Sequence, residues 1–297
     1  MKKFLTILLV VLAACTMPQH SQQEAQAASV QRMRFHCDQD TTRINQLLQD
    51  GIASGIKTPN ELVAFYADKL LSTPYVAHTL EGDEELLTIN IDELDCTTFI
   101  ETLYALARTT MNGRYSWRDY AANLENLRYR NGEMGDYSTR MHYISEWILN
   151  NSARGNLKEV TADLPHADYL IKTIDFMTKH KDSYRSLKND SAMVEKIKGY
   201  EMALRNHRMP YLKKSWLGDK AVKAALRNGD FVGLVTKIEG LDISHLGIIH
   251  KDDKGEIYLL DASMSGGKVM LEEKNLRDHL SGSKSTCLGI RVFRIVP

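Results

Sequence analysis

Three residues in this chain have the types and the order that a thiol-dependent acyl-transfer site requires. The first, Cys96, follows Asp95 at the expected start of a helix, in the run Asp-Cys-Thr-Thr-Phe. Unpaired N–H groups and the positive end of the helix dipole stabilise an anion there, so the nucleophilic thiolate form is favoured. The same N–H groups could hold a tetrahedral oxyanion. The alternative interpretation of Cys96 is a buried structural cysteine.

A nucleophilic thiol needs a base, and the base needs an acceptor that orients its other ring nitrogen. His245 lies at the head of an expected strand over 244–250, and Asp261 ends the next strand. Two antiparallel neighbours joined by a turn at 251–254 would bring these side chains into one layer. Gly247 permits another chain or side chain to approach closely. A strand histidine alone is more often structural, but the ordered set of three indicates a Cys–His–Asp site.

The expected elements place helices first and strands last. Thr58-Pro59-Asn60-Glu61 is a capping box that predicts a helix to about residue 71, and Asp95 and Ser116 are similar caps. The final third changes to short apolar runs split by turn residues. Helices followed by an antiparallel strand run are typical of an α+β domain. The predicted helices are 58–71, 96–109, 117–127, 138–150 and 191–208, and the predicted strands are 85–91, 230–238, 244–250, 255–262, 268–272 and 288–296.

Composition excludes several classes of function. The 297 residues contain 38 Lys+Arg and 38 Asp+Glu, and this balance argues against a nucleic-acid binder that relies on counterion release. Four cysteines are too few for a disulfide scaffold. The sequence contains neither His-Glu-x-x-His nor Cys-x-x-Cys, the usual spacings of zinc ligands. His245 and His250 lie on one expected strand, five residues apart, so their side chains would face opposite sides. We therefore expect no metal and no cofactor. The basic block 179–188 is interpreted as a solvated loop or as a face toward carboxylates or phosphates.

The N-terminus has the pattern of a targeting segment. Lys2 and Lys3 precede an apolar run over 4–12 that is too short to span a bilayer. Leu-Ala-Ala before Cys15 resembles a bacterial lipobox, in which cleavage precedes a cysteine whose sulfur receives lipid. An ordinary secretory signal is the alternative. We expect a membrane-attached protein with a signal peptide at 1–14, a polar tether at 15–35 and one catalytic domain at 36–297.

Lipid on Cys15 would leave an odd number of cysteines in an oxidising compartment. Cys37 could pair with Cys287, which would leave Cys96 as a free reactive thiol. Three free thiols are the alternative, and the spacing does not decide between them.

The chain resembles the NlpC/p60 cell-wall cysteine hydrolases, and more closely their N-acetylmuramoyl-L-alanine amidase-like branch. The similarity runs from about residue 60 to the C-terminus, and Asp-Cys-Thr-Thr-Phe is its most specific part. It implies a papain-like core, in which N-terminal helices pack on an antiparallel β-sheet or partial barrel. The matching segments are 71–75, 94–101, 138–143, 228–230 and 244–248.

The resemblance implies hydrolysis of the amide between the muramoyl lactyl group and L-Ala, with anhydro-muropeptides as expected substrates. Cys96 would be the nucleophile, His245 the base and Asp261 the third polar residue. Such an enzyme would face the periplasm in the cell envelope. Three alternatives stay open: a stem-peptide endopeptidase that cuts between D-Glu and the diamino acid, a thiol acyltransferase, and a non-catalytic peptidoglycan-binding lipoprotein.

Four further residues in the matching segments have physical roles in substrate binding. The planar fork of Arg140 could pair with a stem-peptide carboxylate. His142 and Tyr143 could hydrogen-bond to peptide or sugar, and Tyr75 could stack on a sugar face. The alternatives are a structural ion pair for Arg140 and core packing for the two tyrosines.

Overall fold

The computed structural model describes residues 32–282 and 285–297. The predicted signal peptide, Cys15 and most of the predicted tether lie outside these residues. The end of the tether segment forms strand β1 (Met33–Phe35), which pairs with β2 (Leu87–Ile89). No helix within the described residues is both long enough and apolar enough to cross a membrane.

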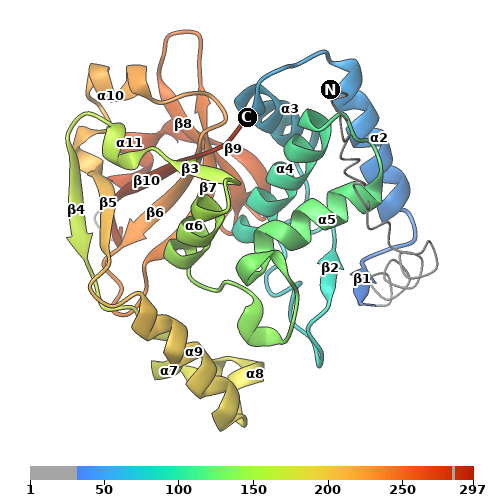
Figure 1. Ribbon diagram of the computed structural model, residues 1–297. Coiled ribbons are helices and arrows are strands. Elements are labelled where there is room, and N and C mark those ends of the chain that lie inside the picture. Colours follow the sequence, from blue (N-terminus) through green and yellow to red (C-terminus); the bar gives the residue numbers. More distant parts are fainter. Residues whose placement is uncertain (1–31, 283–284) are drawn as a thin grey trace, which may run out of the picture. The chain divides into compact units, whose positions relative to one another are not determined.

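The N-terminal half of the unit Arg34–Pro297 is mainly helical (Figure 1). Three of its helices, α3, α4 and α5, begin at the caps that the sequence predicts. The Thr58 side chain accepts the N–H of Glu61, and Asp95 accepts the N–H groups of Thr97 and Thr98. Helix α4 is buried along most of its length because it packs against α3, α5, β7 and β8. The helices are α2 (Asp40–Ala53), α3 (Pro59–Lys69), α4 (Cys96–Met111), α5 (Trp117–Arg128) and α6 (Ile144–Ala153).

The C-terminal half supplies an antiparallel sheet in the order β4-β5-β10-β6-β7-β8-β9, with β3 also paired to β10. The predicted mixed α+β class is therefore confirmed, and the described strands form an open sheet and no closed barrel. The strands are β3 (Leu157–Glu159), β4 (Ala167–Ile171), β5 (Arg208–Lys213), β6 (Phe231–Thr236), β7 (Ile243–Lys251), β8 (Ile257–Ser263), β9 (Lys268–Asn275) and β10 (Cys287–Ile295).

Two predicted helices are shorter than expected. The helix predicted over 138–150 begins only at Ile144, because Arg140 is extended and bridges to Tyr129. The helix predicted over 191–208 ends at Ala203 as α9 (Ser191–Ala203). The chain then enters β5, in which Met209, Pro210 and Leu212 are buried.

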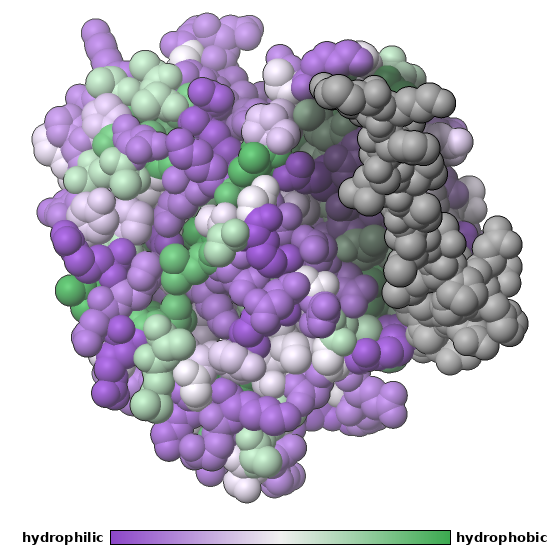
Figure 2. All heavy atoms as spheres, in the orientation of Figure 1, coloured by the Kyte–Doolittle hydropathy of each residue, from purple (hydrophilic) through white to green (hydrophobic). Residues whose placement is uncertain are grey.

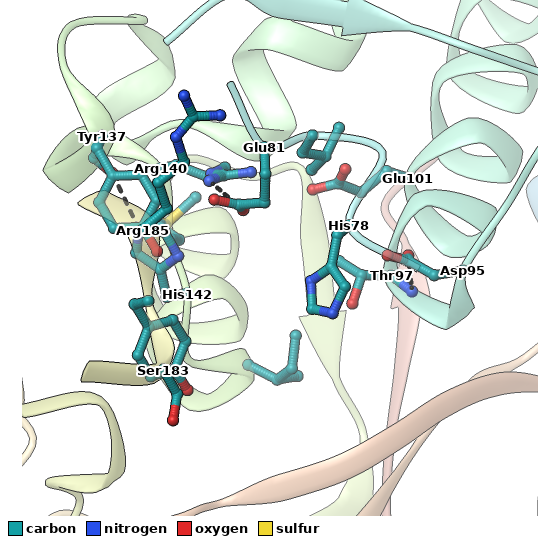
Figure 3. Close-up of a pocket in the computed structure, with 14 residues that line it drawn as sticks. His78, Glu81, Asp95, Thr97, Glu101, Tyr137, Arg140, His142, Ser183 and Arg185 are labelled. Carbon is teal, nitrogen blue, oxygen red and sulfur yellow. Dashed lines mark hydrogen bonds and ion pairs between the residues drawn. The ribbon is translucent and has the colours of Figure 1, made fainter. Parts of the chain in front are cut away.

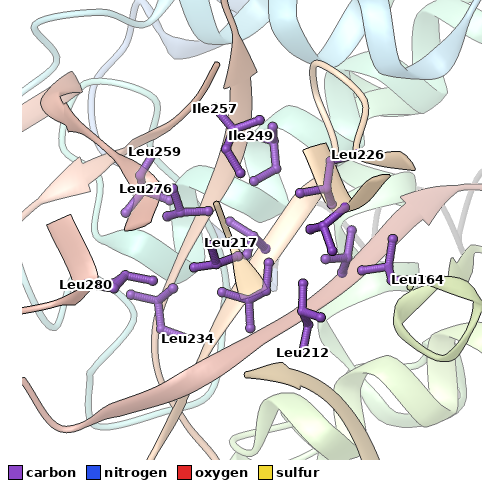
Figure 4. Packing of buried hydrophobic residues seen from close by; sticks show 14 of the residues in the cluster. Leu164, Leu212, Leu217, Leu226, Leu234, Ile249, Ile257, Leu259, Leu276 and Leu280 are labelled. Atoms are coloured by element: carbon purple, nitrogen blue, oxygen red, sulfur yellow. The ribbon is translucent and has the colours of Figure 1, made fainter. Parts of the chain in front are cut away.

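A small helical insertion separates β4 from β5 and projects from the sheet at the lower end of Figure 1. It contains α7 (Phe176–Lys179), α8 (Arg185–Lys188) and α9, which share one apolar cluster with Tyr137 and Tyr143. A second cluster lies between the sheet and the short helices α10 (Lys220–Ala225) and α11 (Leu276–Leu280) (Figure 4). The face shown in Figure 2 is mainly hydrophilic.

A buried polar junction joins the helical half to the sheet. The Asp230 carboxylate accepts hydrogen bonds from Arg294 at 2.5 and 2.8 Å and from the Asn60 amide at 2.8 Å. Gly229 before it has φ 79°, and a Cβ there would lie 2.1 Å from the Asn60 carbonyl oxygen. Only glycine fits this close approach. The Asn-Gly-Asp segment thus fixes the start of α3 against β6 and β10.

The possible Cys37–Cys287 disulfide is not formed, since Cys37, Cys96 and Cys287 are all free. The Cys37 sulfur lies 3.6 Å from oxygens of Asp40 and Asp92, whereas the buried Cys287 sulfur contacts the carbonyl of Gly289. The two thiols therefore have separate surroundings, and the third free thiol, Cys96, does not depend on their pairing.

Candidate active site

Cys96 is the first residue of α4. The cap residue Asp95 accepts hydrogen bonds from most of the backbone N–H groups at this helix start. The Asp95 carboxylate accepts the N–H groups of Thr97 at 3.0 Å and Thr98 at 2.8 Å. The Asp95 carbonyl accepts that of Phe99 at 2.9 Å. Within the described residues, the N–H of Cys96 itself has no acceptor. We predicted that several N–H groups at the helix start could stabilise an oxyanion. Of the N–H groups of residues 96–99, only that of Cys96, beside the half-buried thiol, is left for this role.

His245 and Asp261 lie on the adjacent strands β7 and β8, and His245 Nε2 is hydrogen-bonded to Asp261 Oδ2. The Asp261 side chain is almost wholly buried, and that of His245 is 23% exposed. Gly247 makes this pairing possible, because a Cβ there would lie 3.1 Å from the Asp261 Cβ and 2.9 Å from the Leu260 oxygen. The close approach that Gly247 predicts is confirmed.

The pKa of His245 is raised to about 10 by its two neighbours. Burial by itself lowers this pKa, but the hydrogen bond to Asp261 and the hydrogen bond and charge interaction with Cys96 outweigh it. Because Nε2 faces Asp261, Nδ1 is the ring nitrogen left for the thiol. The packing of α4 on β7 and β8 thus brings the three sequence-predicted residues together, in an order suited to a thiolate–imidazolium pair.

Substitution Asp261→Asn is expected to lower kcat/KM near neutral pH by about 10- to 100-fold. Asparagine still accepts the Nε2–H bond but lacks the charge, so the pKa of His245 falls from about 10. The alkaline limb of the kcat/KM profile, which reports loss of the His245 proton, should move to lower pH. The matched substitution Asp253→Asn, in the exposed turn between the same strands, should leave the profile unchanged.

The same proton links stability to pH. Between about pH 6.5 and 10 the folded protein holds a proton on His245 that the unfolded chain has lost. This contribution to the free energy of unfolding is complete below pH 6.5 and is lost as the pH rises through 10. The loss should be smaller in Asp261→Asn, as measured by urea unfolding at pH 7 and 9.5. Identical alkaline limbs and identical pH trends in both proteins would contradict the assigned pairing.

Tyr75 lies beside Cys96. A bridge to Leu94 and a hydrogen bond from its N–H to the Gly267 carbonyl hold its backbone. Burial and the negative charges of Cys96 and Asp95 raise the pKa of the Tyr75 hydroxyl. Tyr75 therefore keeps its proton and offers a neutral O–H donor near the Cys96 sulfur. Stacking on a sugar, the predicted role, stays a prediction.

A cavity of about 570 Å³ opens between the start of α4 and the helical insertion (Figure 3). The residues on either side of Cys96 in the chain line it, whereas Cys96, His245 and Asp261 are not among its lining residues. Asp95, Thr97 and Glu101 line it from α4. Arg140 and His142 line it from the extended segment before α6. The loop before β2 contributes His78, Leu80 and Glu81, and the turn at α8 contributes Ser183, Tyr184 and Arg185. The rest of the wall comes from the segment that leads into α6, with residues Tyr137, Met141 and Ile144.

Tyr143 does not line this cavity. Its hydroxyl donates to Glu201 at 2.7 Å and accepts the N–H of Met177 at 2.8 Å, within the buried cluster of the insertion. Neighbouring side chains on extended backbone point to opposite faces, so His142 and Tyr143 lie on different sides. Core packing, the alternative interpretation of Tyr143, matches its position.

Arg140 lines the cavity, but its charge is already balanced. Its guanidinium lies 2.8 Å from a Glu81 oxygen and 3.4 Å from a Glu85 oxygen, and the side chain is almost fully buried. The guanidinium also lies 5.0 Å from the centre of the Tyr137 ring. A stem-peptide carboxylate would have to compete with two protein carboxylates for this side chain. The structural ion pair weighed in the sequence analysis is present.

A second buried pair lies under the cavity. Arg128 Nε contacts Glu101 Oε2 at 2.7 Å, and both side chains are about 3% exposed. Arg128 also donates to the Thr88 carbonyl at 2.9 Å. Sequence reasoning assigned no role to Glu101, Glu81 or Tyr137. The only local signal for Glu101 is a charged residue within an otherwise apolar stretch of α4.

One cluster of the described residues could hold a metal ion. Ligand atoms of Cys37, Asp40 and Asp92 lie within 4.8 Å of one another. Asp40 already accepts the N–H groups of His36 and Cys37, and Asp92 forms an ion pair with Arg43. None of the three predicted catalytic residues belongs to this cluster.

Comparisons with known proteins identify similar sequences and folds. A family model described as AmiA-like, N-acetylmuramoyl-L-alanine amidase-like, matches residues 66–289. A crystal structure of an N-acetylmuramoyl-L-alanine amidase from Bacteroides uniformis ATCC 8492 is 34% identical, with a TM-score of 0.74, over 80% of this chain and 99% of that chain. No curated protein matches the chain.

A second similar structure has a different name. A protein from Bacteroides fragilis, whose name proposes a xylanase, is 39% identical with a TM-score of 0.71, over 77% of this chain and 98% of that chain. A Legionella pneumophila protein is 22% identical with a TM-score of 0.65 and supports the fold alone.

Proposed function

The chain belongs to the N-acetylmuramoyl-L-alanine amidase-like family, and we propose that it is a cysteine amidase with a papain-like NlpC/p60 core. Its proposed reaction is hydrolysis of the amide between the muramoyl lactyl group and L-Ala of peptidoglycan fragments. The observation that carries this proposal is the contact chain from Cys96 through His245 to Asp261. A buried Asp–His pair beside a free thiol at a helix start favours a nucleophilic thiolate.

The first half of the reaction forms a thioester. The Cys96 thiolate attacks the lactyl carbonyl carbon and forms the S–C bond, and the carbonyl electron pair moves to oxygen. The free N–H of Cys96 and the protonated Tyr75 hydroxyl are the donors available for this oxyanion. When the C–N bond breaks, His245 gives its proton to the leaving L-Ala nitrogen.

The second half releases the sugar acid. Neutral His245 takes a proton from water, and the hydroxide attacks the thioester carbonyl. The C–S bond then breaks and returns the thiolate, while the proton stays on the imidazole. Asp261 accepts the Nε2–H bond throughout and stabilises the imidazolium. No cofactor enters either step.

The proposed substrates are small muropeptides, including anhydro-muropeptides. The cavity beside Cys96 has a volume of about 570 Å³, which is in the range of pockets that bind small ligands. Its size supports binding of one fragment rather than of an extended glycan strand.

A glycosidase function has less support. Glycoside hydrolysis needs two carboxyl groups that can act as acid and as base or nucleophile. In the cavity, Glu101 is paired with Arg128 and Glu81 with Arg140. Asp95 accepts two backbone N–H groups as a helix cap. These carboxylates are committed to structural partners, so the thiol is the better candidate for the reacting group.

Mass spectrometry of the products tests the proposal. The chain without residues 1–15 is incubated with N-acetylmuramoyl-L-Ala-D-Glu-diamino acid. The amidase releases the free tripeptide and the muramoyl sugar. An endopeptidase would instead release the diamino acid and leave sugar and dipeptide joined, and an acyltransferase would require an added amine acceptor. Sugar release from xylan without any cleavage of the muropeptide would overturn the proposal.

We also propose that the protein is anchored by lipid on Cys15 and faces the periplasm. This proposal rests on the sequence of residues 1–15 alone. In the full chain, Cys15→Ala is expected to move the protein from the detergent phase to the aqueous phase in a Triton X-114 partition. A wild-type chain found in the aqueous phase would instead support an ordinary secretory signal.

A further inference from the structure

We propose that His142 is a specificity-determining residue, whose Nδ1 accepts a hydrogen bond from an uncharged N–H or O–H group of the muropeptide in the cavity beside Cys96. The inference rests on the proposed function and deepens it, because it states which partner donates and which accepts in one hydrogen bond between protein and substrate. His142 is one of the cavity-lining side chains labelled in Figure 3.

The first step is the tautomer of the His142 ring. Its Nε2 lies 2.9 Å from the backbone carbonyl oxygen of Tyr137. A carbonyl oxygen can only accept, so Nε2 must carry the hydrogen. In a neutral ring Nδ1 then has a lone pair and no hydrogen. No donor among the described residues reaches Nδ1.

The second step is that the ring is held neutral and in place. Burial and the positive charges of Arg140 and Arg130 lower the pKa of His142 to about 3. The Tyr137 ring packs on the imidazole with centroids 4.4 Å apart and an interplanar angle of 36°. The lone pair of Nδ1 therefore has a fixed position, and it is not converted to a donor under ordinary conditions.

The third step is the charge of the surrounding wall. Arg140 is balanced by Glu81 and Glu85, and Arg185 at the rim is paired with Asp83. No unpaired arginine or lysine lies among the residues that line the cavity. A carboxylate placed against a lone pair would be repelled and would lose its hydration without compensation. A hydroxyl or an amide N–H of the substrate can donate a hydrogen bond to Nδ1, so that neither the donor nor the histidine acceptor is left without a partner.

Two substitutions separate this role from a structural one. In His142→Asn, the side-chain oxygen takes the position of Nδ1, but the bond to the Tyr137 carbonyl is lost. In His142→Gln, the amide nitrogen takes the position of Nε2 and keeps that bond, but the acceptor at Nδ1 is lost. The proposal expects the asparagine variant to bind more tightly than the glutamine variant. A structural role expects the reverse order, together with a lower melting temperature for the asparagine variant.

The measurement is the Kd of the N-acetylmuramoyl tripeptide by calorimetry, in the full chain carrying Cys96→Ala so that no turnover occurs. We expect His142→Gln to weaken binding about 10-fold and His142→Asn to stay within about 3-fold of the parent. The matched control is His180→Gln. His180 Nδ1 also lies 2.8 Å from a backbone carbonyl and its ring stacks on Phe176, but it does not line the cavity. This control should not change Kd.

Unchanged binding in His142→Gln, or weaker binding in the asparagine variant than in the glutamine variant, would overturn the assignment. If wild-type protein cleaves the muropeptide while these variants bind equally, only the role of His142 fails. If wild-type protein neither cleaves nor binds it, the proposed function fails as well.

Discussion

Replacing Cys96 by alanine is expected to lower muropeptide hydrolysis by about 10⁴-fold or more, without unfolding the protein. The substitution removes the sulfur that forms the thioester, and no other described thiol contacts His245. The half-buried side chain fills little of the core, so the melting temperature should change only slightly. The rate is measured by product release from the muropeptide under kcat/KM conditions.

Cys37 provides the matched control. It is also a free, half-buried thiol near a helix start, but its sulfur faces Asp40 and Asp92. Cys37→Ala should retain activity within about twofold. Iodoacetamide should modify Cys96 first near neutral pH, and His245→Ala should slow that reaction. Activity of Cys96→Ala above a tenth of the wild-type value would end the thiol mechanism.

Substitution Glu101→Gln is expected to lower the free energy of unfolding by about 3–5 kcal/mol. The change leaves the Arg128 charge buried with only the Thr88 carbonyl as a strong partner. The lost interaction is large because both side chains are about 3% exposed and water cannot replace the carboxylate. Urea unfolding followed by circular dichroism measures the difference.

The exposed pair Glu195–Lys198 on α9 is the matched control. Glu195→Gln should give no measurable change, because solvent screens a surface ion pair. The double substitution Glu101→Leu with Arg128→Met removes both charges and should recover most of the stability. A Glu101→Gln protein as stable as the wild type would show that the pair contributes nothing to the fold.

The elements with local signals could be predicted from sequence. Caps at Thr58, Asp95 and Ser116 start α3, α4 and α5, because cap hydrogen bonds depend only on residues two or three apart. Helix α2 was missed, since its apolar contacts to the core come from the narrow stripe Ile44 and Leu48. Strand β5 was missed because Pro210 interrupts its pattern and its partners β4 and β10 lie far away in sequence.

The candidate site shows the same division between local and distant information. Cys96, His245 and Asp261 could each be placed on an element with a readable boundary, and their order suggested one reaction. The partners of Arg140 could not be predicted, because Glu81 and Glu85 lie in a loop whose position depends on tertiary packing. The opposite directions of His142 and Tyr143 followed from extended backbone in a segment that was expected to be helical.

Strand β10 has a consequence for biogenesis. It is synthesised after every other strand that the structure describes, yet it pairs with β3, β5 and β6 inside the sheet. A nascent chain therefore cannot complete its sheet until residues 287–295 have been synthesised. If the chain is exported as proposed, it would enter the translocation channel before its sheet is complete. The active enzyme would then fold only in the periplasm.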